Sequence, residues 1–185
     1  MTKKISGVES TEKAFSFTLT ATEETQQKIA AGDLGVSDDL AGDAHAESKA
    51  TKDKIIKDKG QTVDFSNMTF NKAGEYTFTL TEVHNADDDP AADGVQNAGW
   101  TMDASTYTVT VRGEDKDAKL TVTGVTVKKD GDAEAKPIKA EVKDGKVNLA
   151  TFINSYAAKG SVTLAAKKRF RGGALAGNDF SFALY

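Results

Sequence analysis

Three polar side chains, Lys3, Glu82 and Asn154, stand on segments in which every second residue is apolar. Side chains at a spacing of two share one face of a strand, so all three are predicted to point inward. Their apolar neighbours on the same faces are Ile5, Tyr76, Phe78, Leu80, Phe152 and Tyr156. Burial lowers the pKa of an amine and favours its neutral, nucleophilic form, whereas burial raises the pKa of a carboxyl, which can then donate a hydrogen bond. An amine, a carboxyl and a carboxamide that meet in such a core could form an amide bond and release ammonia.

Each of the three residues also has an ordinary interpretation. Lys3 could be a solvated lysine near the start of the chain, Glu82 could end its strand in solvent, and Asn154 could occupy a turn. A bulge in the first strand would reverse its alternation, and Lys4 would then point inward in place of Lys3.

Few other residues suggest a chemical site. The chain has no cysteine, which excludes a zinc–thiolate site, a thiol nucleophile and a disulfide framework. His45 and His84 have no partner at metal-ligand spacing, and the acidic run Asp87–Asp89 could bind a cation but is more typical of a solvated loop. The sequence contains no phosphate-binding loop, no nucleophile elbow and no carboxylate pair suited to turnover. We therefore expect no metal, no cofactor and no enzyme that turns over an external substrate.

The composition is that of a globular chain with a core. Hydrophobic residues make up 38% and charged residues 28% of the 185 residues, and the formal net charge of −4 is spread along the sequence. No basic patch indicates a nucleic-acid partner, and no apolar run is long enough to span a membrane. The start, Met1–Lys4, has no apolar signal region, and the chain stops inside the alternating run Ser181–Tyr185, so we interpret it as an excised fragment.

Alternation of period two dominates the sequence and predicts an all-β, Ig-like antiparallel β-sandwich of short strands. Glycine and aspartate turns separate the strands, with hairpin signals at Asp130–Gly131 and Asp144–Gly145 and a bend at Ser66–Asn67. The remaining apolar positions of the predicted strands are Phe15, Phe17, Leu19, Val63, Phe65, Met68, Phe70, Tyr107, Val109, Val111, Leu120, Val122, Val125 and Val127. Trp100 could cap the core or mark a contact surface.

One region departs from this pattern. The segment Thr22–Ala31 is polar and favours a helix, with Thr22 as the N-cap and Gly32 as the stop. Residues 33–60 follow as a long loop insertion rich in Asp, Lys and Ala, with room for another helical turn near Ser48–Ile56.

A partial repeat links the start of the chain to its end. Lys3 precedes Phe15, the first residue of Phe-Ser-Phe-Thr-Leu, by 12 residues (15 − 3 = 12). Lys168 precedes Phe180, the first residue of Phe-Ser-Phe-Ala-Leu, by the same number (180 − 168 = 12).

The repeat predicts two domains. A complete domain is expected over residues 1–158, and the first strands of a second, truncated domain are expected over residues 159–185. Lys168 matches Lys3, but its partners would lie beyond the end of the chain.

Four segments occur in an order typical of one family: Lys3–Gly7, Val63–Glu82, Met102–Val109 and Phe152–Tyr156. The second ends in Gly-x-Tyr-x-Phe-x-x-x-Glu, the third resembles a Tyr-Asp segment with Met102 in place of the aromatic residue, and the last reads Phe-x-Asn-x-Tyr. Together they resemble the streptococcal pilin isopeptide-linkage domain, which is found in Gram-positive major pilins and related surface proteins.

The resemblance implies a reaction. In that family a lysine on the first strand bonds to an asparagine on the last strand with the help of a glutamate, which implies Lys3 as the nucleophile, Asn154 as the acceptor and Glu82 as the catalytic acid/base. Glu82 would donate a hydrogen bond to the carboxamide oxygen and relay protons so that ammonia leaves. The bond would close a loop of 151 residues (154 − 3 = 151) and stabilise the fold by about 5 kcal/mol, by analogy with a disulfide. Lys168 would be a second-domain nucleophile without partners.

The function that the resemblance implies is structural. The chain would be a module of a stalk or pilus shaft, secreted and anchored to the cell wall of a Gram-positive bacterium, with neighbouring domains or pilin subunits as partners. The alternative is an adhesin domain that binds a host ligand through the loops at 33–60 or 84–100. A carbohydrate-active enzyme is the weakest hypothesis, because no catalytic carboxylate pair is evident.

Overall fold

The computed structural model describes residues 1–36, 55–65, 68–83, 99–138, 147–157 and 171–172, together with the backbone of residues 45–49. Within these residues the fold is a β-sandwich with one short helix, and the all-β prediction is confirmed. No helix in this described part of the chain is long and apolar enough to cross a lipid bilayer.

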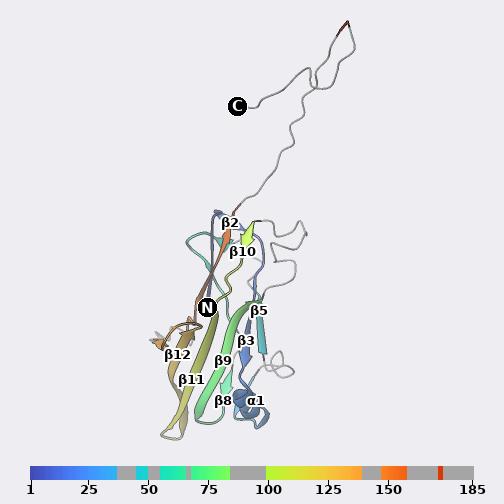
Figure 1. The fold of residues 1–185 in the computed structure, drawn as a ribbon. Coiled ribbons are helices and arrows are strands. Elements are labelled where there is room, and N and C mark those ends of the chain that lie inside the picture. Colours follow the sequence, from blue (N-terminus) through green and yellow to red (C-terminus); the bar gives the residue numbers. More distant parts are fainter. Residues whose placement is uncertain are drawn as a thin grey trace.

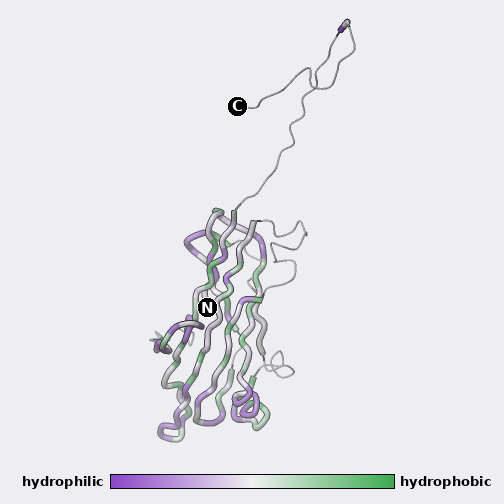
Figure 2. Tube along the Cα trace, viewed as in Figure 1, coloured by the Kyte–Doolittle hydropathy of each residue, from purple (hydrophilic) through white to green (hydrophobic). Residues whose placement is uncertain are grey.

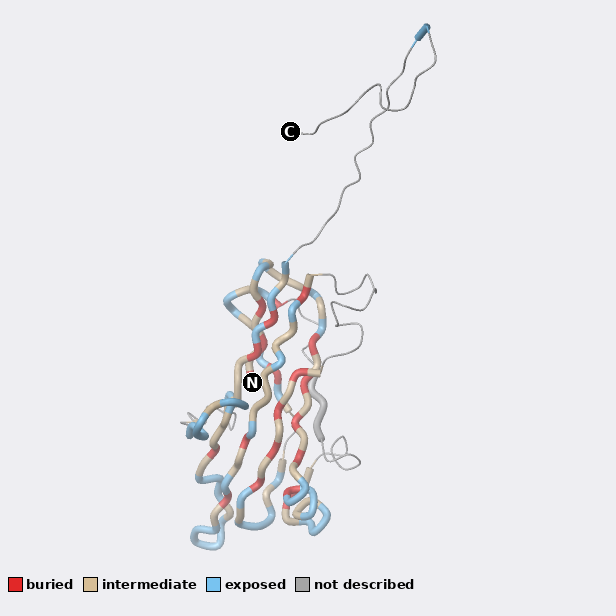
Figure 3. The backbone as a smooth tube through the Cα atoms, in the orientation of Figure 1, coloured by how far each residue is buried: buried red, intermediate tan, exposed pale blue. Residues whose placement is uncertain are grey.

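The larger layer is a six-stranded sheet that runs along the length of the domain (Figure 1). Its strands, in spatial order, are β13 (Lys136–Ile138), β12 (Lys119–Lys129), β11 (Thr106–Lys116), β9 (Gly74–Val83), β3 (Ser16–Ala21) and β5 (His45–Lys49). All neighbours in this sheet pair antiparallel. Every second residue of β3 and β9 is buried, which is the alternation that the sequence shows, and Figure 3 shows buried positions along these strands and exposed ones at the turns.

The smaller layer is a four-stranded sheet. Its strands, in spatial order, are β10 (Trp100–Thr101), β14 (Thr151–Tyr156), β1 (Thr2–Ser6) and β7 (Gln61–Thr62). The pairs β10–β14 and β1–β7 are antiparallel, but β1 and β14 run parallel, which departs from the wholly antiparallel sandwich that was predicted. A parallel pair needs a long connection, and here the rest of the domain supplies it.

Short elements cover the two ends of the sandwich. The lower end in Figure 1 carries α1 (Glu23–Ala30) and the strand pair β4 (Leu34–Gly35) and β8 (Thr69–Phe70). The strand pair β2 (Ser10–Thr11) and β6 (Ile55–Ile56) lies toward the opposite end, where β10 also lies.

The helix α1 begins and ends one residue inside the predicted range. Thr22 is its N-cap, although its hydroxyl makes no capping hydrogen bond to a backbone N–H of the helix. The hydroxyl lies 3.2 Å from Oγ1 of Thr25 and 3.1 Å from the carbonyl oxygen of Thr77. Gly32 has φ +79°, and its N–H donates to the carbonyl of Ile29, which ends the helix as predicted. The helix is strongly hydrophilic (Figure 2), so its position depends on a few contacts with β9 and β3.

The insertion at 33–60 contains strands, and the helical turn considered near Ser48–Ile56 is wrong at both ends of that range. Ser48 belongs to β5, which pairs with β3, and Ile56 belongs to β6, which pairs with β2. Edge strands expose unpaired backbone N–H and C=O groups, and β5 satisfies those of β3. Residues 50–54 lie outside the described residues.

The hairpin predicted at Asp130–Gly131 is confirmed, because it connects β12 to β13 and Gly131 has φ +85°. The predicted turn at Asp144–Gly145 and the bend at Ser66–Asn67 lie outside the described residues.

Trp100 caps the core, and so the first of its two interpretations holds. Its ring is 5.5 Å from that of Phe15 in a T-shaped arrangement and 5.1 Å from that of Tyr156. The other buried apolar residues between the layers are Met1, Ile5, Phe17, Leu19, Ala21, Leu34, Ile55, Val63, Tyr76, Phe78, Leu80, Val109, Val125 and Phe152.

Candidate functional site

The parallel pair β1–β14 brings Lys3 and Asn154 onto neighbouring strands. Lys3 is opposite Phe152 and Ile5 is opposite Asn154, so Lys3 and Asn154 are two residues apart in register. Because side chains at a spacing of two share a face, both point into the sandwich. Both residues are 0% exposed.

Gly7 allows the ends of β1 and β14 to approach closely. It has φ +77°, and a Cβ atom at this position would overlap the carbonyl oxygen of Tyr156. A side chain would therefore push the two strands apart, which explains the glycine of the Lys3–Gly7 segment physically.

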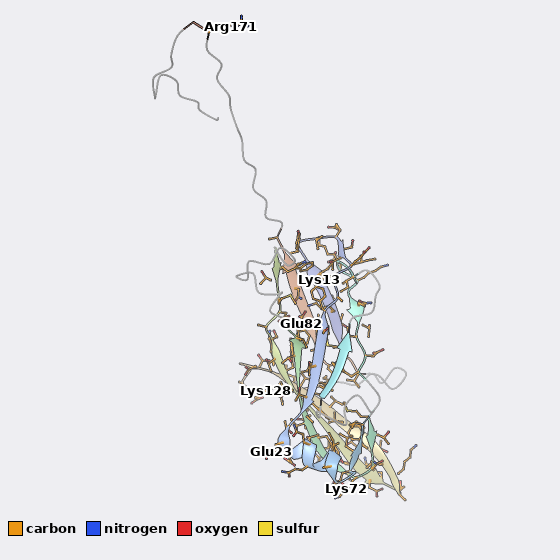
Figure 4. All side chains as sticks on the ribbon, turned by 90° about the vertical axis from the view of Figure 1, so that its right-hand side faces the viewer. Lys13, Glu23, Lys72, Glu82, Lys128 and Arg171 are labelled. Carbon is orange, nitrogen blue, oxygen red and sulfur yellow. The ribbon has the colours of Figure 1, made fainter. Side chains whose placement is uncertain are left out.

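Glu82 joins Lys3 and Asn154 from the opposite layer. It lies on β9, and its Oε2 atom is 2.8 Å from Nζ of Lys3. Its Oε1 atom accepts a hydrogen bond of 2.7 Å from Nδ2 of Asn154. Glu82 is 6% exposed and therefore buried, and Figure 4 shows it well away from the end of the domain that Glu23 marks. One buried carboxylate therefore bridges an amine and a carboxamide.

The surroundings of Lys3 favour its neutral form more than water would. Nζ lies 4.6 Å from the ring centre of Phe15 and 5.7 Å from that of Phe17; these rings exclude water, although their faces attract a cation. Burial lowers the pKa of Lys3 from 10.5 to about 8, although the charge and hydrogen bond of Glu82 offset part of that decrease. A substantial fraction of the amine is therefore neutral in mildly alkaline solution.

The orientation of the Asn154 carboxamide is fixed on both sides. Its Oδ1 atom accepts a hydrogen bond of 2.7 Å from the backbone N–H of Asp103, and its Nδ2 atom faces Glu82 and lies 3.3 Å from Sδ of Met102. The expectation that Glu82 donates to the carboxamide oxygen is therefore wrong. A backbone N–H can only donate, so the N–H of Asp103 bonds to the carboxamide oxygen, and the Glu82 carboxylate accepts the hydrogen bond from the carboxamide N–H.

Asp103 lies in the loop between β10 and β11 and holds that loop against β14. Its Oδ1 atom accepts from the backbone N–H of Ser105 at 3.0 Å, and its Oδ2 atom accepts from that of Ile153 at 2.8 Å. Burial alone would raise the pKa of Asp103, but hydrogen bonds from Ser105 and Ile153 outweigh it and lower the pKa overall.

The structure thus brings together Lys3, Glu82 and Asn154, and their predicted inward orientation is confirmed. Lys4 is half-buried and points away from them. The residues Lys168, His84 and Asp87–Asp89 lie outside the described residues, as does most of 159–185, and the side chain of His45 is not described.

Sequence reasoning assigned no role to Asp103, although it identified the segment around it. Aspartate side chains in turns commonly accept a hydrogen bond from the backbone N–H two residues further on. That signal predicts the contact with Ser105 but not the contact with Asn154.

These features define a class of protein: an all-β sandwich in which a glutamate of one sheet joins a lysine and an asparagine of the first and last strands of the other. The chain belongs to the FctA family, the Spy0128-like isopeptide containing domain, whose family model matches residues 1–157.

Several solved structures of pilins are similar to this chain. The major pilin protein T-13 from Streptococcus pyogenes has 17% identity over 84% of this chain and 50% of its own, with a TM-score of 0.43. The major pilin protein T3.2 from the same species has 17% identity over 85% of this chain and 51% of its own, with a TM-score of 0.47. A further major pilin of that species has 19% identity over 84% and 49%, with a TM-score of 0.43. The chain thus spans about half the length of these pilins. No curated protein matches it.

Proposed function

We propose that the chain is a structural module of a Gram-positive cell-surface stalk or pilus shaft, locked by an isopeptide bond between Lys3 and Asn154. The observation that carries the proposal is the position of Glu82, whose two oxygens contact the amine of Lys3 and the carboxamide of Asn154 at 2.8 and 2.7 Å. Membership of the isopeptide-containing family supports the same conclusion.

The contacts suggest how the bond forms. Neutral Nζ of Lys3 attacks Cγ of Asn154, and the Glu82 carboxylate accepts a proton from Nζ through Oε2. The carboxyl then delivers this same proton to Nδ2, the Cγ–Nδ2 bond breaks, and ammonia leaves. The fold supplies proximity, which is worth about 7–11 kcal/mol in well-oriented reactions. The buried site keeps water from the product amide.

The reaction occurs once in each molecule, and its product is the protein itself. Lys3 and Asn154 are both consumed, so the site has no turnover and Glu82 serves a single self-directed step. The bond would therefore stabilise the fold, and the role of the module would be mechanical.

Neighbouring modules or pilin subunits are the proposed partners, at the surface of the cell. Residues 159–185 would begin a second module of the same kind, and Lys168 would be its nucleophile. Stacked modules that contact only their neighbours build length, which suits a stalk or shaft.

The intact mass of the purified chain tests the proposal. We expect a deficit of about 17 Da, one ammonia, in the parent and the full calculated mass in Glu82→Ala and Lys3→Ala. Lys4→Ala is the matched control and should retain the deficit, and peptide mapping should recover the segments around Lys3 and Asn154 as one branched peptide. A parent with its full calculated mass would contradict the proposal.

A further inference from the structure

We propose that the backbone N–H of Asp103 is the oxyanion donor for this reaction, and that the Asp103 carboxylate is the positioning group that aims it. The inference rests on the proposed bond between Lys3 and Asn154. It adds a donor that acts on the oxygen of Asn154, opposite the side of the carboxamide that Glu82 contacts.

The donor lies where negative charge develops. When Nζ of Lys3 bonds to Cγ of Asn154, the carbonyl π electrons move onto Oδ1, which becomes the oxyanion of the tetrahedral intermediate. In the unreacted site the backbone N of Asp103 already lies 2.7 Å from this oxygen, and an oxyanion donor needs a distance of about 2.7–3.1 Å once the charge has developed. Because Asn154 is 0% exposed, little water competes for the oxygen.

The two hydrogen bonds that the carboxamide makes to Asp103 and Glu82 are consistent with its orientation. The N–H of Asp103 can only donate, and so it selects Oδ1 of Asn154. The bridging carboxylate of Glu82 can only accept, and so it selects Nδ2. The two contacts polarise the carboxamide in the direction that the reaction needs, with negative charge toward Asp103 and the leaving nitrogen toward the group that protonates it.

The Asp103 carboxylate fixes the direction of its own N–H. It is held at two points, by Ser105 in its own loop and by Ile153, which directly precedes Asn154 on β14. The loop and the acceptor strand are thus tied together one residue from the reacting carboxamide. Without the carboxylate the N–H of Asp103 would remain, but it would no longer be held in the direction of Oδ1 of Asn154. The side chain is therefore a positioning group.

The atoms balance without an additional reactant. The Nζ–Cγ bond forms, one Nζ proton passes through Glu82 to Nδ2, the Cγ–Nδ2 bond breaks, and the electron pair on Oδ1 restores the carbonyl as ammonia departs. The N–H of Asp103 keeps its proton throughout and contributes only the hydrogen bond.

A backbone ester at Asp103 tests the donor directly. The full chain is made with malic acid in place of this aspartate, which replaces the N–H by oxygen and keeps the carboxylate. The chain is recovered unreacted in denaturant and refolded, and the mass loss of about 17 Da is followed over time. Removal of one oxyanion donor slows comparable reactions about 10²–10³-fold, and a slowing of this size is expected.

The matched control is the same ester at Asp132. Its backbone N–H also makes one hydrogen bond, to the carbonyl of Lys129 at 3.0 Å, but in the hairpin between β12 and β13. The rate of ammonia loss should be unchanged in this variant. Equal rates for the esters at Asp103 and Asp132 would overturn the inference.

The positioning role is tested with Asp103→Ala and Asp103→Asn. Both should slow bond formation, and Asp103→Asn should slow it less, because one carboxamide oxygen can replace one of the two contacts. Their effect on folding is measured separately in a Lys3→Met background, where no bond can form. A rate loss that disappears once the variants are compared at equal folded fraction would mean that Asp103 only stabilises the fold, and would overturn its positioning role.

Failure of this inference is distinguishable from failure of the proposed function. If the parent never loses ammonia, the proposed bond is absent and the inference falls with it. If the parent loses ammonia and the Asp103 ester does so at the parent rate, the bond stands and the oxyanion donor is wrong.

Discussion

Strand β9 carries a buried polar side chain near each end, on the same face, and the two are held in different ways. At one end the hydroxyl of Tyr76 lies 2.7 Å from the carbonyl oxygen of Lys72 and 3.2 Å from that of Asp33. At the other end Glu82 lies between the amine of Lys3 and the carboxamide of Asn154. Both arrangements satisfy buried polar atoms, so burial alone does not distinguish them.

The difference lies in the chemistry of the partners. Main-chain carbonyls carry no net charge and do not react with a phenol, and burial raises the pKa of Tyr76, so the phenol stays neutral and unreactive. Glu82 instead joins a nucleophile to an electrophile. Reactive potential in this fold therefore depends on which side chains the neighbouring strands supply.

The largest difference between the two ends should come from Glu82→Ala. This variant cannot form the bond and leaves the buried Lys3 amine without its carboxylate. It should lose about 5 kcal/mol from the missing crosslink and about 3–5 kcal/mol from the orphaned amine. Urea unfolding followed by Trp100 fluorescence measures the loss. Lys3→Met is the control, because it lacks the crosslink but has no buried amine. Equal stability of the two variants would contradict the second contribution.

The rate of bond formation should depend on pH through Lys3. Burial lowers its pKa from 10.5 to about 8. Well below pH 8 the neutral fraction of the amine therefore rises about tenfold with each unit of increase in pH, and it reaches a plateau above pH 8. After refolding from denaturant, ammonia loss at pH 6 should therefore be about fiftyfold slower than at pH 8, where half of the amine is neutral. A rate that falls above pH 8 would instead assign Glu82 as an acid in the first step.

The same shift predicts the sign of a stability effect in an unbonded variant. Between pH 8 and 10.5, Lys3 of the Asn154→Ala variant is protonated in the unfolded chain but has lost this proton in the folded chain. The free energy of unfolding should therefore rise with pH across this window, and the rise should disappear when Lys3→Met is added.

The smallest effect is expected at the other end of the strand. Tyr76→Phe removes the hydroxyl and leaves the carbonyls of Lys72 and Asp33 without that donor, which should lower the free energy of unfolding by about 1–3 kcal/mol. The mass deficit and the rate of ammonia loss should not change. Slower bond formation in Tyr76→Phe would show that the two ends of β9 are coupled.

Alternation predicted the strands and the inward faces of Lys3, Glu82 and Asn154, because a side-chain period of two is a local property of a strand. The helix that follows Thr22 was predicted from a different signal, a polar, helix-favouring segment between an N-cap residue and Gly32. Alternation did not predict that β5 would be a strand, since edge pairing with β3 is a tertiary contact and not a property of the local sequence.

The wrong expectation that Glu82 donates a hydrogen bond to the carboxamide oxygen also arose because a tertiary contact has no signal in the local sequence. Reasoning from side chains alone gave Glu82 the oxygen of Asn154, because a protonated carboxyl is a good donor. The competing donor is a backbone N–H of Asp103, which has no signature in the sequence and depends on how a loop lies against β14.

The parallel pairing of β1 and β14 has a consequence for how far the module can be extended under tension. In a parallel pair, the chain before the first strand and the chain after the last one leave in opposite directions along the pair. With Lys3 bonded to Asn154, a pull on both ends passes through the crosslink, and the 151 residues from one to the other (154 − 3 = 151) are withheld from extension. At about 3.3–3.6 Å for each extended residue, the crosslink would prevent roughly 500 Å of extension in each module. A fibre of such modules would hold its length under tension, as a tether must if it is to transmit a pull instead of absorbing it.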